Sequence, residues 1–232
     1  GDSNIANLKN MLEELCRLEI IPDIEFFVNR RDFPLLKRNG TEPYNHLWND
    51  DNKPLVSHKY SKYAPILSMV TSNEFADIAI PNHNDWARVM AKENKWFPKS
   101  VGDFNDDFDK FKWKDKIPTG VFRGSSTGMG VTIETNQRLK ISHLSVNTAV
   151  DKDGVPLIDA GITSWNLRPR KISGYDKPQS IIPEKLDFGL VEFMSLKEQS
   201  KYKYIIHIEG HVESFRLSME LAMNSVIIMV KS

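Results

Sequence analysis

The first half of the chain alternates one helical pattern with short apolar runs. Apolar residues at positions 5, 8, 11, 12, 15 and 18 have helical spacing, and Pro22 ends that pattern. The runs at 24–29, 65–70 and 77–80 have the length of buried strands. Residues 86–95 form a further helical pattern that is closed by Pro98. This half is therefore predicted to alternate helix and strand.

The second half repeats this alternation more clearly. Its predicted strands cover residues 119–123, 156–160, 204–208 and 226–230, and its predicted helices cover 133–145 and 213–223. Ser195 and Glu198 have the spacing of a capping box that opens a short additional helix. The last strand, helix and strand form a βαβ unit whose strands are almost wholly apolar, as parallel strands buried on both faces tend to be. We expect an α/β fold with a doubly wound sheet and ligands at the carboxyl ends of its strands.

Residues 100–116 separate the two halves by composition, because Asp, Lys, Phe and Trp dominate there. We place a boundary at this shift. The predicted domains are an N-terminal lobe of residues 1–114 and a C-terminal lobe of residues 115–232.

Composition excludes several classes of protein. The 31 basic residues balance 31 acidic ones, so no overall field attracts a nucleic acid or an anionic membrane. The sequence has no run of eighteen apolar residues and no signal-peptide pattern at its start, so we expect no stable membrane insertion. Cys16 is the single cysteine, which favours a reducing compartment such as the cytoplasm. The secretory pathway stays open if a leader was removed.

The segment Gly120-Val-Phe-Arg-Gly-Ser-Ser-Thr-Gly-Met-Gly130 is a candidate anion site. A short apolar run ends in Arg123, whose planar fork suits a phosphate, and the glycines and hydroxyls that follow can direct several donors at one point. No Gly-Lys-Ser/Thr follows at the P-loop spacing. The alternative is an ordinary loop, since Gly/Ser clusters between periodic segments commonly form loops.

A second candidate anion site follows the predicted strand at 204–208, in Glu209-Gly-His-Val-Glu-Ser-Phe-Arg216. Ser214 and Arg216 stand at the start of the next predicted helix, where unpaired N–H groups and the helix dipole favour an anion. Arg216 could instead be solvated or salt-bridged. Two anion-capable loops suggest a diphosphate ligand.

Two further patterns resemble metal motifs but have simpler explanations. Asp151-Lys-Asp153 precedes Gly154, and Asp-Gly is typical of a turn. His207 and His211 stand four residues apart, as in a zinc protease motif, but His207 ends a predicted strand, Gly210 interrupts the segment and no Glu follows the first histidine directly. We therefore assign no metal ligands.

Four motifs, taken together and in order, resemble the family 90 glycosyltransferases. They are Asn29-Arg-Arg-Asp-Phe-Pro34, Val121-Phe-Arg-Gly-Ser125, Asp159-Ala-Gly-Ile-Thr163 and the segment from Tyr202 to Arg216. The family includes the Rumi-type protein O-glucosyltransferases and the fungal capsule-associated xylosyltransferases. The resemblance covers residues 22 to 230.

This resemblance implies a GT-B-like fold of two Rossmann-like lobes with a cleft between them. It also implies a UDP-sugar donor carrying a glucose- or xylose-like sugar, an inverting transfer to a hydroxyl on a protein or glycan, and no obligatory metal or other cofactor. Asp32 matches the family's catalytic base, and Arg123 and Arg216 would hold the diphosphate. The remaining donor-binding candidates are Gly124, Ser125, Thr127, Ser214 and Phe215.

The sequence departs from the family pattern in two places. Ser126 stands where relatives commonly carry arginine or another residue, and family domains continue beyond the strand at 226–230. We therefore expect a C-terminal lobe that is incomplete at its end or a compact variant, and a viral or other microbial member without a retention signal.

Asp32 could also be a turn residue or an ion-pair partner of Arg30 or Arg31. The alternative function is a non-catalytic module that binds a nucleotide sugar or a carbohydrate. A nucleic-acid-binding role is disfavoured by the neutral charge.

Overall fold

The chain divides into two compact units, residues 1–100 and 101–232, in this computed structural model. The structure describes residues 3–39, 63–83, 85–86, 111–147, 150–212 and 214–231. The predicted lobe boundary between residues 114 and 115 stays a prediction.

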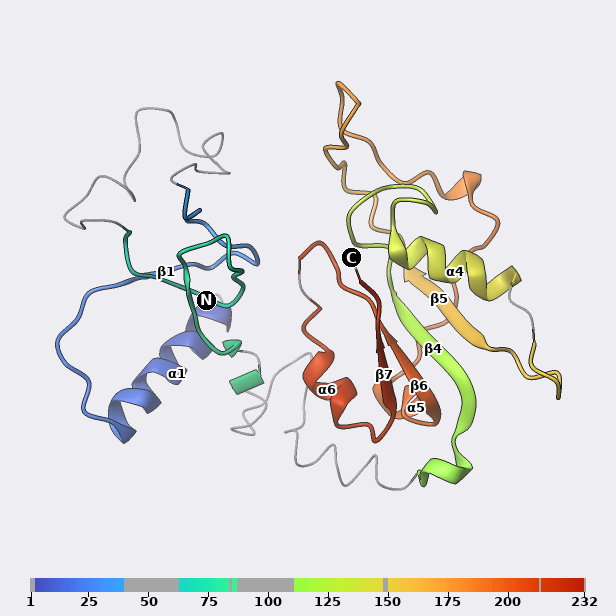
Figure 1. The fold of residues 1–232 in the computed structure, drawn as a ribbon, viewed down its shortest axis with the longest axis horizontal. Helices are drawn as coiled ribbons and strands as arrows, with labels where there is room; N and C mark the ends of the chain where they lie inside the picture. Colours follow the sequence, from blue (N-terminus) through green and yellow to red (C-terminus); the bar gives the residue numbers. More distant parts are fainter. Residues whose placement is uncertain are drawn as a thin grey trace. The chain divides into compact units, whose positions relative to one another are not determined.

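The first unit pairs one long helix with a small parallel sheet (Figure 1). Helix α1 covers Ser3–Leu18, which confirms the helical pattern. The strands are β1 (Phe27–Val28), β2 (Ile66–Ser68) and β3 (Ile78–Ala79), in the order β1-β2-β3. They lie within the three predicted runs but are shorter. Most of the predicted helix at 86–95 lies outside the described residues.

A buried carboxylate anchors this unit. The Asp77 side chain accepts hydrogen bonds from the backbone N–H groups of Leu35 and Leu36, at 3.0 and 2.8 Å, and from the Ser68 hydroxyl at 2.6 Å. Leu36 packs in a small core with Ala64 and Ile66. Asp77 therefore fixes the chain that leaves the loop after β1 against β2, because a buried charge is tolerated only when its acceptors are satisfied.

The second unit contains a four-stranded parallel sheet in the order β5-β4-β6-β7. Its strands are β4 (Ile117–Ser125), β5 (Ile158–Ser164), β6 (Tyr202–His207) and β7 (Val226–Met229). Its helices are α4 (Gln137–Asn147), α5 (Leu196–Gln199) and α6 (Leu217–Leu221), with 3-10 turns at Trp113–Asp115 and Pro183–Lys185. The predicted parallel α/β fold is confirmed.

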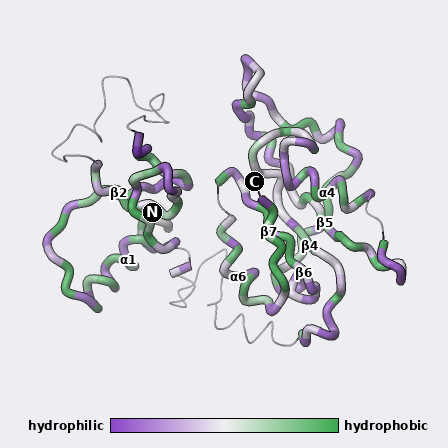
Figure 2. Tube along the Cα trace, in the orientation of Figure 1, coloured by the Kyte–Doolittle hydropathy of each residue, from purple (hydrophilic) through white to green (hydrophobic). Residues whose placement is uncertain are grey.

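Both faces of this sheet carry a core, because successive strand residues point to opposite sides. Phe122 and Ile206 belong to the cluster that contains Leu139 of α4. Their neighbours Val121 and Ile205 belong to a second cluster on the other face, together with residues from the ends of α5 and α6. Figure 2 shows the hydrophobic character of β6 and β7 that makes such burial favourable.

The chain order of the strands creates a switch point between β4 and β6. The chain runs from β4 outward to β5 and then returns to β6 on the other side of β4. Ligands of open α/β sheets bind at such a point, outside the carboxyl ends of the strands. Ser125 and His207 are the last residues of these two strands.

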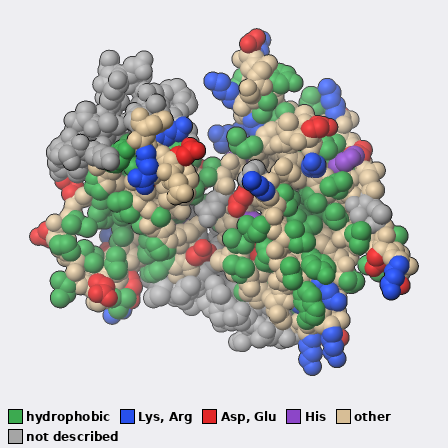
Figure 3. Space-filling model, in the orientation of Figure 1, with side chains coloured by type: hydrophobic (Ala, Val, Ile, Leu, Met, Phe, Trp, Pro, Cys, Tyr) green, Lys and Arg blue, Asp and Glu red, His purple; other side chains and the backbone are tan. Residues whose placement is uncertain are grey.

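The apolar run of the last strand predicts burial on both faces, and that expectation is wrong. Strand β7 is the edge of the sheet, and its residues Val226, Ile228 and Met229 are exposed. Figure 3 shows apolar side chains at the surface over α6 and β7. The sequence pattern identifies a strand but cannot tell an edge from a centre.

Two local predictions are confirmed in detail. Ser195 and Glu198 form the capping box of α5, each side chain accepting from the other's backbone N–H. The Asp151 carboxylate accepts from the backbone N–H groups of Asp153 and Val155, and Gly154 adopts φ +79°. The Asp-Lys-Asp sequence is thus a turn.

Gly130 and Gly154 offer a matched test of the loop after β4. Both have positive φ, but a Cβ on Gly130 would lie 2.3 Å from the Thr135 carbonyl oxygen, whereas one on Gly154 would meet nothing within 4 Å. Gly130→Ala is expected to lower the free energy of unfolding by about 3 kcal/mol, from backbone strain plus steric overlap. Gly154→Ala should lower it by about 1 kcal/mol, from strain alone. Urea unfolding of both variants measures the difference, and equal losses would contradict the proposed packing.

Candidate functional site

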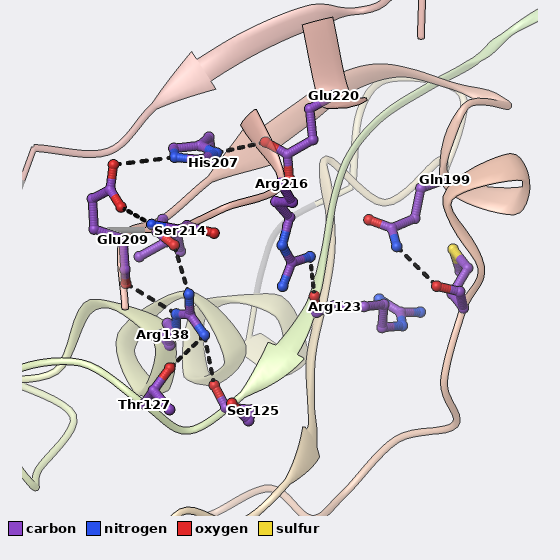
Figure 4. A network of polar contacts seen from close by, with 12 residues as sticks. Arg123, Ser125, Thr127, Arg138, Gln199, His207, Glu209, Ser214, Arg216 and Glu220 are labelled. Carbon is purple, nitrogen blue, oxygen red and sulfur yellow. Dashed lines mark hydrogen bonds and ion pairs between the residues drawn. The ribbon is translucent and has the colours of Figure 1, made fainter. Parts of the chain in front are cut away.

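Arg138 joins the loop after β4 to the end of β6 (Figure 4). Its guanidinium donates to the carbonyl oxygens of Ser125, Ile208 and Glu209 at 2.9 to 3.1 Å, and to the Thr127 hydroxyl at 2.6 Å. The side chain is buried on α4. Because these acceptors come from both sides of the switch point, Arg138 holds the two strand ends together.

Arg216 approaches the same place from the start of α6. Its Nη1 donates to the Arg123 carbonyl oxygen at 2.6 Å, and no hydrogen bond joins its Nη2 to a described residue. A Cβ on Gly124 would lie 3.0 Å from Arg216 Nη2 and 3.5 Å from Arg138 Nη1. Gly124 therefore provides the space in which two guanidinium groups converge.

The Phe122 ring lies beside both cations. The guanidinium carbons of Arg138 and Arg216 are 5.6 and 5.9 Å from its centroid, within cation–π range. Burial lowers the pKa of Arg138 to about 10, and repulsion from Arg216 adds to the shift. Burial also lowers the pKa of Arg216, while Glu220 opposes that change. Because arginine side chains keep their proton in proteins, the two groups concentrate positive charge at low solvation.

Arg123 has a different environment from the one that its motif suggests. Its guanidinium forms an ion pair with Asp159, with Nη2 at 2.7 Å from Oδ1, and also donates to the Phe122 and Asp159 carbonyl oxygens. The Tyr202 hydroxyl donates to the other Asp159 oxygen at 2.9 Å. Burial, with Asp159 adding to it, raises the pKa of Tyr202 to about 12. The Asp159 carboxylate of β5 thus forms an ion pair with the Arg123 guanidinium of the neighbouring strand β4.

A buried histidine links the end of β6 to α6. His207 Nδ1 lies 2.5 Å from Glu220 Oε2, and its Nε2 lies 3.3 Å from Glu209 Oε1. The second Glu209 oxygen accepts the backbone N–H of Ser214, and Glu220 Oε1 lies 3.7 Å from Arg216 Nε. The contact with Glu220 raises the pKa of His207, with a smaller contribution from Glu209.

A pocket of about 140 Å³ opens between the strand ends. Thr127 to Met129 line one side, Thr135 to Arg138 line the second, and Ile208 to Val212 line the third. Gly128 and Gly130, both with positive φ, shape the loop. Arg170 stabilises this loop by donating hydrogen bonds to the carbonyl oxygens of Ser126 and Gly130. The pocket lies at the switch point, where the topology predicts a ligand.

Asp32 lies in the first unit, in the loop after β1, and its side chain is exposed. The buried Asn29 shapes this loop by donating to the Phe33 carbonyl oxygen at 2.6 Å and accepting the Arg31 backbone N–H at 2.9 Å. Arg31 lies over the Phe33 ring, with the guanidinium carbon 5.4 Å from its centroid. No ion pair joins Asp32 to Arg30 or Arg31 in this described loop, so the carboxylate is presented to solvent.

The structure brings most of the predicted donor-binding residues together in the second unit. Gly124, Ser125, Thr127, Ser214 and Arg216 surround or contact the Arg138 and Glu209 groups, and Phe215 is half-buried between Ser214 and Arg216. Their roles toward a ligand, and those of Arg123 and Asp32, stay predictions.

Sequence reasoning missed the three residues that organise this site. Arg138 and Glu220 lie in none of the quoted motifs, and Glu209 opens the second candidate anion site but is not among the predicted site residues. The alternation of His207 and Glu209 after an apolar strand was the available signal, since it directs both side chains to one side of the strand end. Arg138 gave no signal, because an arginine in a helix is ordinarily solvent-exposed.

Within the described ranges, no group of three or more His, Cys, Asp or Glu side chains could hold a metal ion. Over the same ranges, no helix combines the length and apolar character needed to cross a bilayer.

A sequence profile described as Glycosyl transferase family 90 matches residues 4–232. The chain belongs to glycosyl transferase family 90. The family resemblance carried by the four motifs is thereby confirmed.

Individual relatives include viral and animal proteins. The chain is 46% identical over its full length to uncharacterized protein 179R of Invertebrate iridescent virus 6, covering 22% of that protein. It is 26% identical over 93% of its length to protein O-glucosyltransferase 2 of Danio rerio, covering 34% of it. It is 25% identical over 85% of its length to O-glucosyltransferase rumi of Drosophila melanogaster, covering 39% of it. The chain thus spans between about a fifth and two-fifths of these relatives.

Arg138→Lys tests the bridge between the strand ends. Lysine keeps the charge but cannot reach four acceptors with one ammonium group, so buried carbonyl oxygens lose their donors. The free energy of unfolding is expected to fall by at least about 2 kcal/mol in a urea titration. The matched Arg168→Lys, at an exposed position, should change it by less than about 0.5 kcal/mol. Equal effects would show that Arg138 contributes only charge.

Proposed function

We propose that this chain is the catalytic part of an inverting glycosyltransferase that moves a sugar from a UDP-sugar to a hydroxyl group of a protein or glycan. The observation that carries the proposal is the convergence of Arg138 and Arg216 over Gly124 at the switch point of the second unit. Family membership and the names of the animal relatives, which are O-glucosyltransferases, support a glucose-like sugar.

The two guanidinium groups suit a departing diphosphate. Charge on the UDP leaving group grows as the bond to the sugar breaks, and preorganised donors in a poorly solvated site stabilise that charge most effectively. Arg216 Nη2 has no hydrogen-bond partner among the described residues, so we assign it to the diphosphate. Ser125, Thr127 and Ser214 would position the phosphates from the neighbouring loops. Arg123, paired with Asp159, would act from the opposite side of β4.

Asp32 would act as general base. In the proposed step its carboxylate takes the proton of the acceptor hydroxyl, and the hydroxyl oxygen forms a bond to the anomeric carbon. The bond from that carbon to the diphosphate oxygen breaks on the opposite face, and its electron pair leaves with UDP. The exposed position of Asp32 supports this role, because the base must meet an incoming acceptor.

The proposal includes a GT-B-like fold, with Asp32 on one Rossmann-like lobe and the arginines on the other. The parallel sheets of both units suit Rossmann-like lobes. No metal is assigned to the reaction, since the arginines can supply the positive charge that a metal provides elsewhere. The alternative is a module that binds a nucleotide sugar without transferring it, which would leave Asp32 without a function.

Asp32→Asn separates these two functions. The amide cannot take a proton, so transfer from UDP-glucose is expected to slow roughly 100- to 10,000-fold, while UDP affinity stays unchanged because Asp32 does not hold the donor. Mass spectrometry of the released product measures the rate of transfer, and calorimetry with UDP measures the affinity. Asp23→Asn, at another exposed position before β1, is the matched control. Undiminished transfer by Asp32→Asn would remove Asp32 from the mechanism.

Arg216→Lys tests the donor side. Lysine keeps the charge and loses the fork, so UDP is expected to bind about tenfold or more weakly. Calorimetry and the ligand-induced rise in melting temperature measure this loss. Arg168→Lys should bind UDP like the parent. Should the parent chain bind no UDP, the donor-site assignment itself would be wrong.

A further inference from the structure

His207 is buried with a carboxylate oxygen facing each of its ring nitrogens. Nδ1 faces Glu220 and Nε2 faces Glu209, and the histidine side chain is 1% exposed. An ionised carboxylate only accepts hydrogen bonds, so both nitrogens must carry a proton for both contacts to form. With both acids ionised, this geometry therefore gives an imidazolium, a charged ring enclosed between two carboxylates.

Each of these acids also reaches a residue of the proposed donor site. Glu209 accepts the backbone N–H of Ser214, and Glu220 lies 3.7 Å from Arg216 Nε (Figure 4). One imidazolium thus connects, through two carboxylates, the loop that ends at Ser214 with the guanidinium of Arg216. Without that ring charge, two carboxylates would face one another across a buried space and repel.

The other charged groups around His207 determine the net charge of the site. Arg138 of α4 donates to the Glu209 carbonyl oxygen, and Arg123 of β4 is engaged by Asp159. The neighbouring strand β7, Val226–Met229, is apolar. Arg138, Arg216 and the imidazolium oppose the carboxylates of Glu209 and Glu220, which leaves one net positive charge; loss of the ring proton leaves none.

We propose that His207 is a positioning residue of the donor site, which in its imidazolium form sets Ser214 and Arg216 for the diphosphate. The inference rests on the proposed function. It adds a specific consequence, namely that donor affinity depends on the protonation of a side chain that does not touch the donor.

The sign of the pH dependence follows from the direction of the shift. Glu220 and Glu209 raise the pKa of His207 above its value in the unfolded chain. The stabilising effect is therefore complete below about pH 6.5 and is lost as the pH rises through the folded-state pKa. The diphosphate of UDP-glucose is fully ionised and its uracil ring is neutral near neutral pH, so a change in its affinity there reports on the protein.

The test is calorimetric titration of the full chain with UDP-glucose between about pH 6 and 8, in pairs of buffers that differ in ionisation enthalpy. The parent is expected to bind more weakly as the pH rises and to take up protons on binding, because the bound anion favours the charged ring. His207→Gln should bind several-fold more weakly than the parent at the acid end, with a flat pH profile and no proton uptake.

Three further variants make the outcome specific. His211→Gln removes the other histidine of the loop and should keep the proton uptake. His143→Gln, on the outer part of α4 beside Asp187, should match the parent. Glu209→Gln removes one carboxylate, which lowers the pKa of His207 and moves the fall in affinity to lower pH. That variant also tests the inference should His207→Gln fail to give a cooperative melting curve.

The results that contradict the inference differ from those that contradict the proposed function. Proton uptake that persists in His207→Gln, or that disappears in His211→Gln, overturns the role of His207 while donor binding stands. A pH-independent affinity in the parent overturns it as well. Absence of any UDP-glucose binding by the parent overturns the donor site and the inference together.

Discussion

The second unit depends on a buried guanidinium that bridges two parallel strand ends. Arg138 leaves α4, passes the ring of Phe122 and donates to backbone carbonyl oxygens after β4 and after β6. A parallel sheet leaves unpaired carbonyl groups at its carboxyl edge, and each such group is costly when it is buried without a donor. Arginine can satisfy several at once, because its five N–H groups lie in one rigid plane. The same residue then supplies positive charge where a ligand would bind.

Arg138 and Arg216 would repel if only solvent separated them, and burial lowers the pKa of both. Glu220 and Glu209 bring negative charge close to these arginines, and His207 lies between the two acids with one ring nitrogen facing each. With the imidazolium proposed for His207, this cluster of side chains has one net positive charge, which would attract an anion. A diphosphate would complete this balance.

In each unit, a buried charged side chain fixes the loop that follows a strand. In the first unit, a carboxylate, Asp77, accepts the N–H groups that leave the loop after β1. In the second, a guanidinium donates to the carbonyl groups that follow β4. Both side chains fix the loop that comes directly after a strand. These loops carry the candidate functional residues of each unit. Asp32 and Gly124 therefore stand on backbone that buried charges hold in place.

Sequence alone determined the alternation of helix and strand, the parallel sheet, the capping box at Ser195 and the turn at Asp151, because these follow from periodicity and local hydrogen bonding. It also determined family membership through four ordered motifs. It did not determine that β7 lies at an edge, that Asp159 engages Arg123, or that Arg138 and His207 organise the site. Those facts arise from contacts between segments tens of residues apart, and no local pattern specifies which buried charge meets which partner. Only the tertiary structure decides such pairings, since the cost of burying a charge depends on the whole surrounding fold.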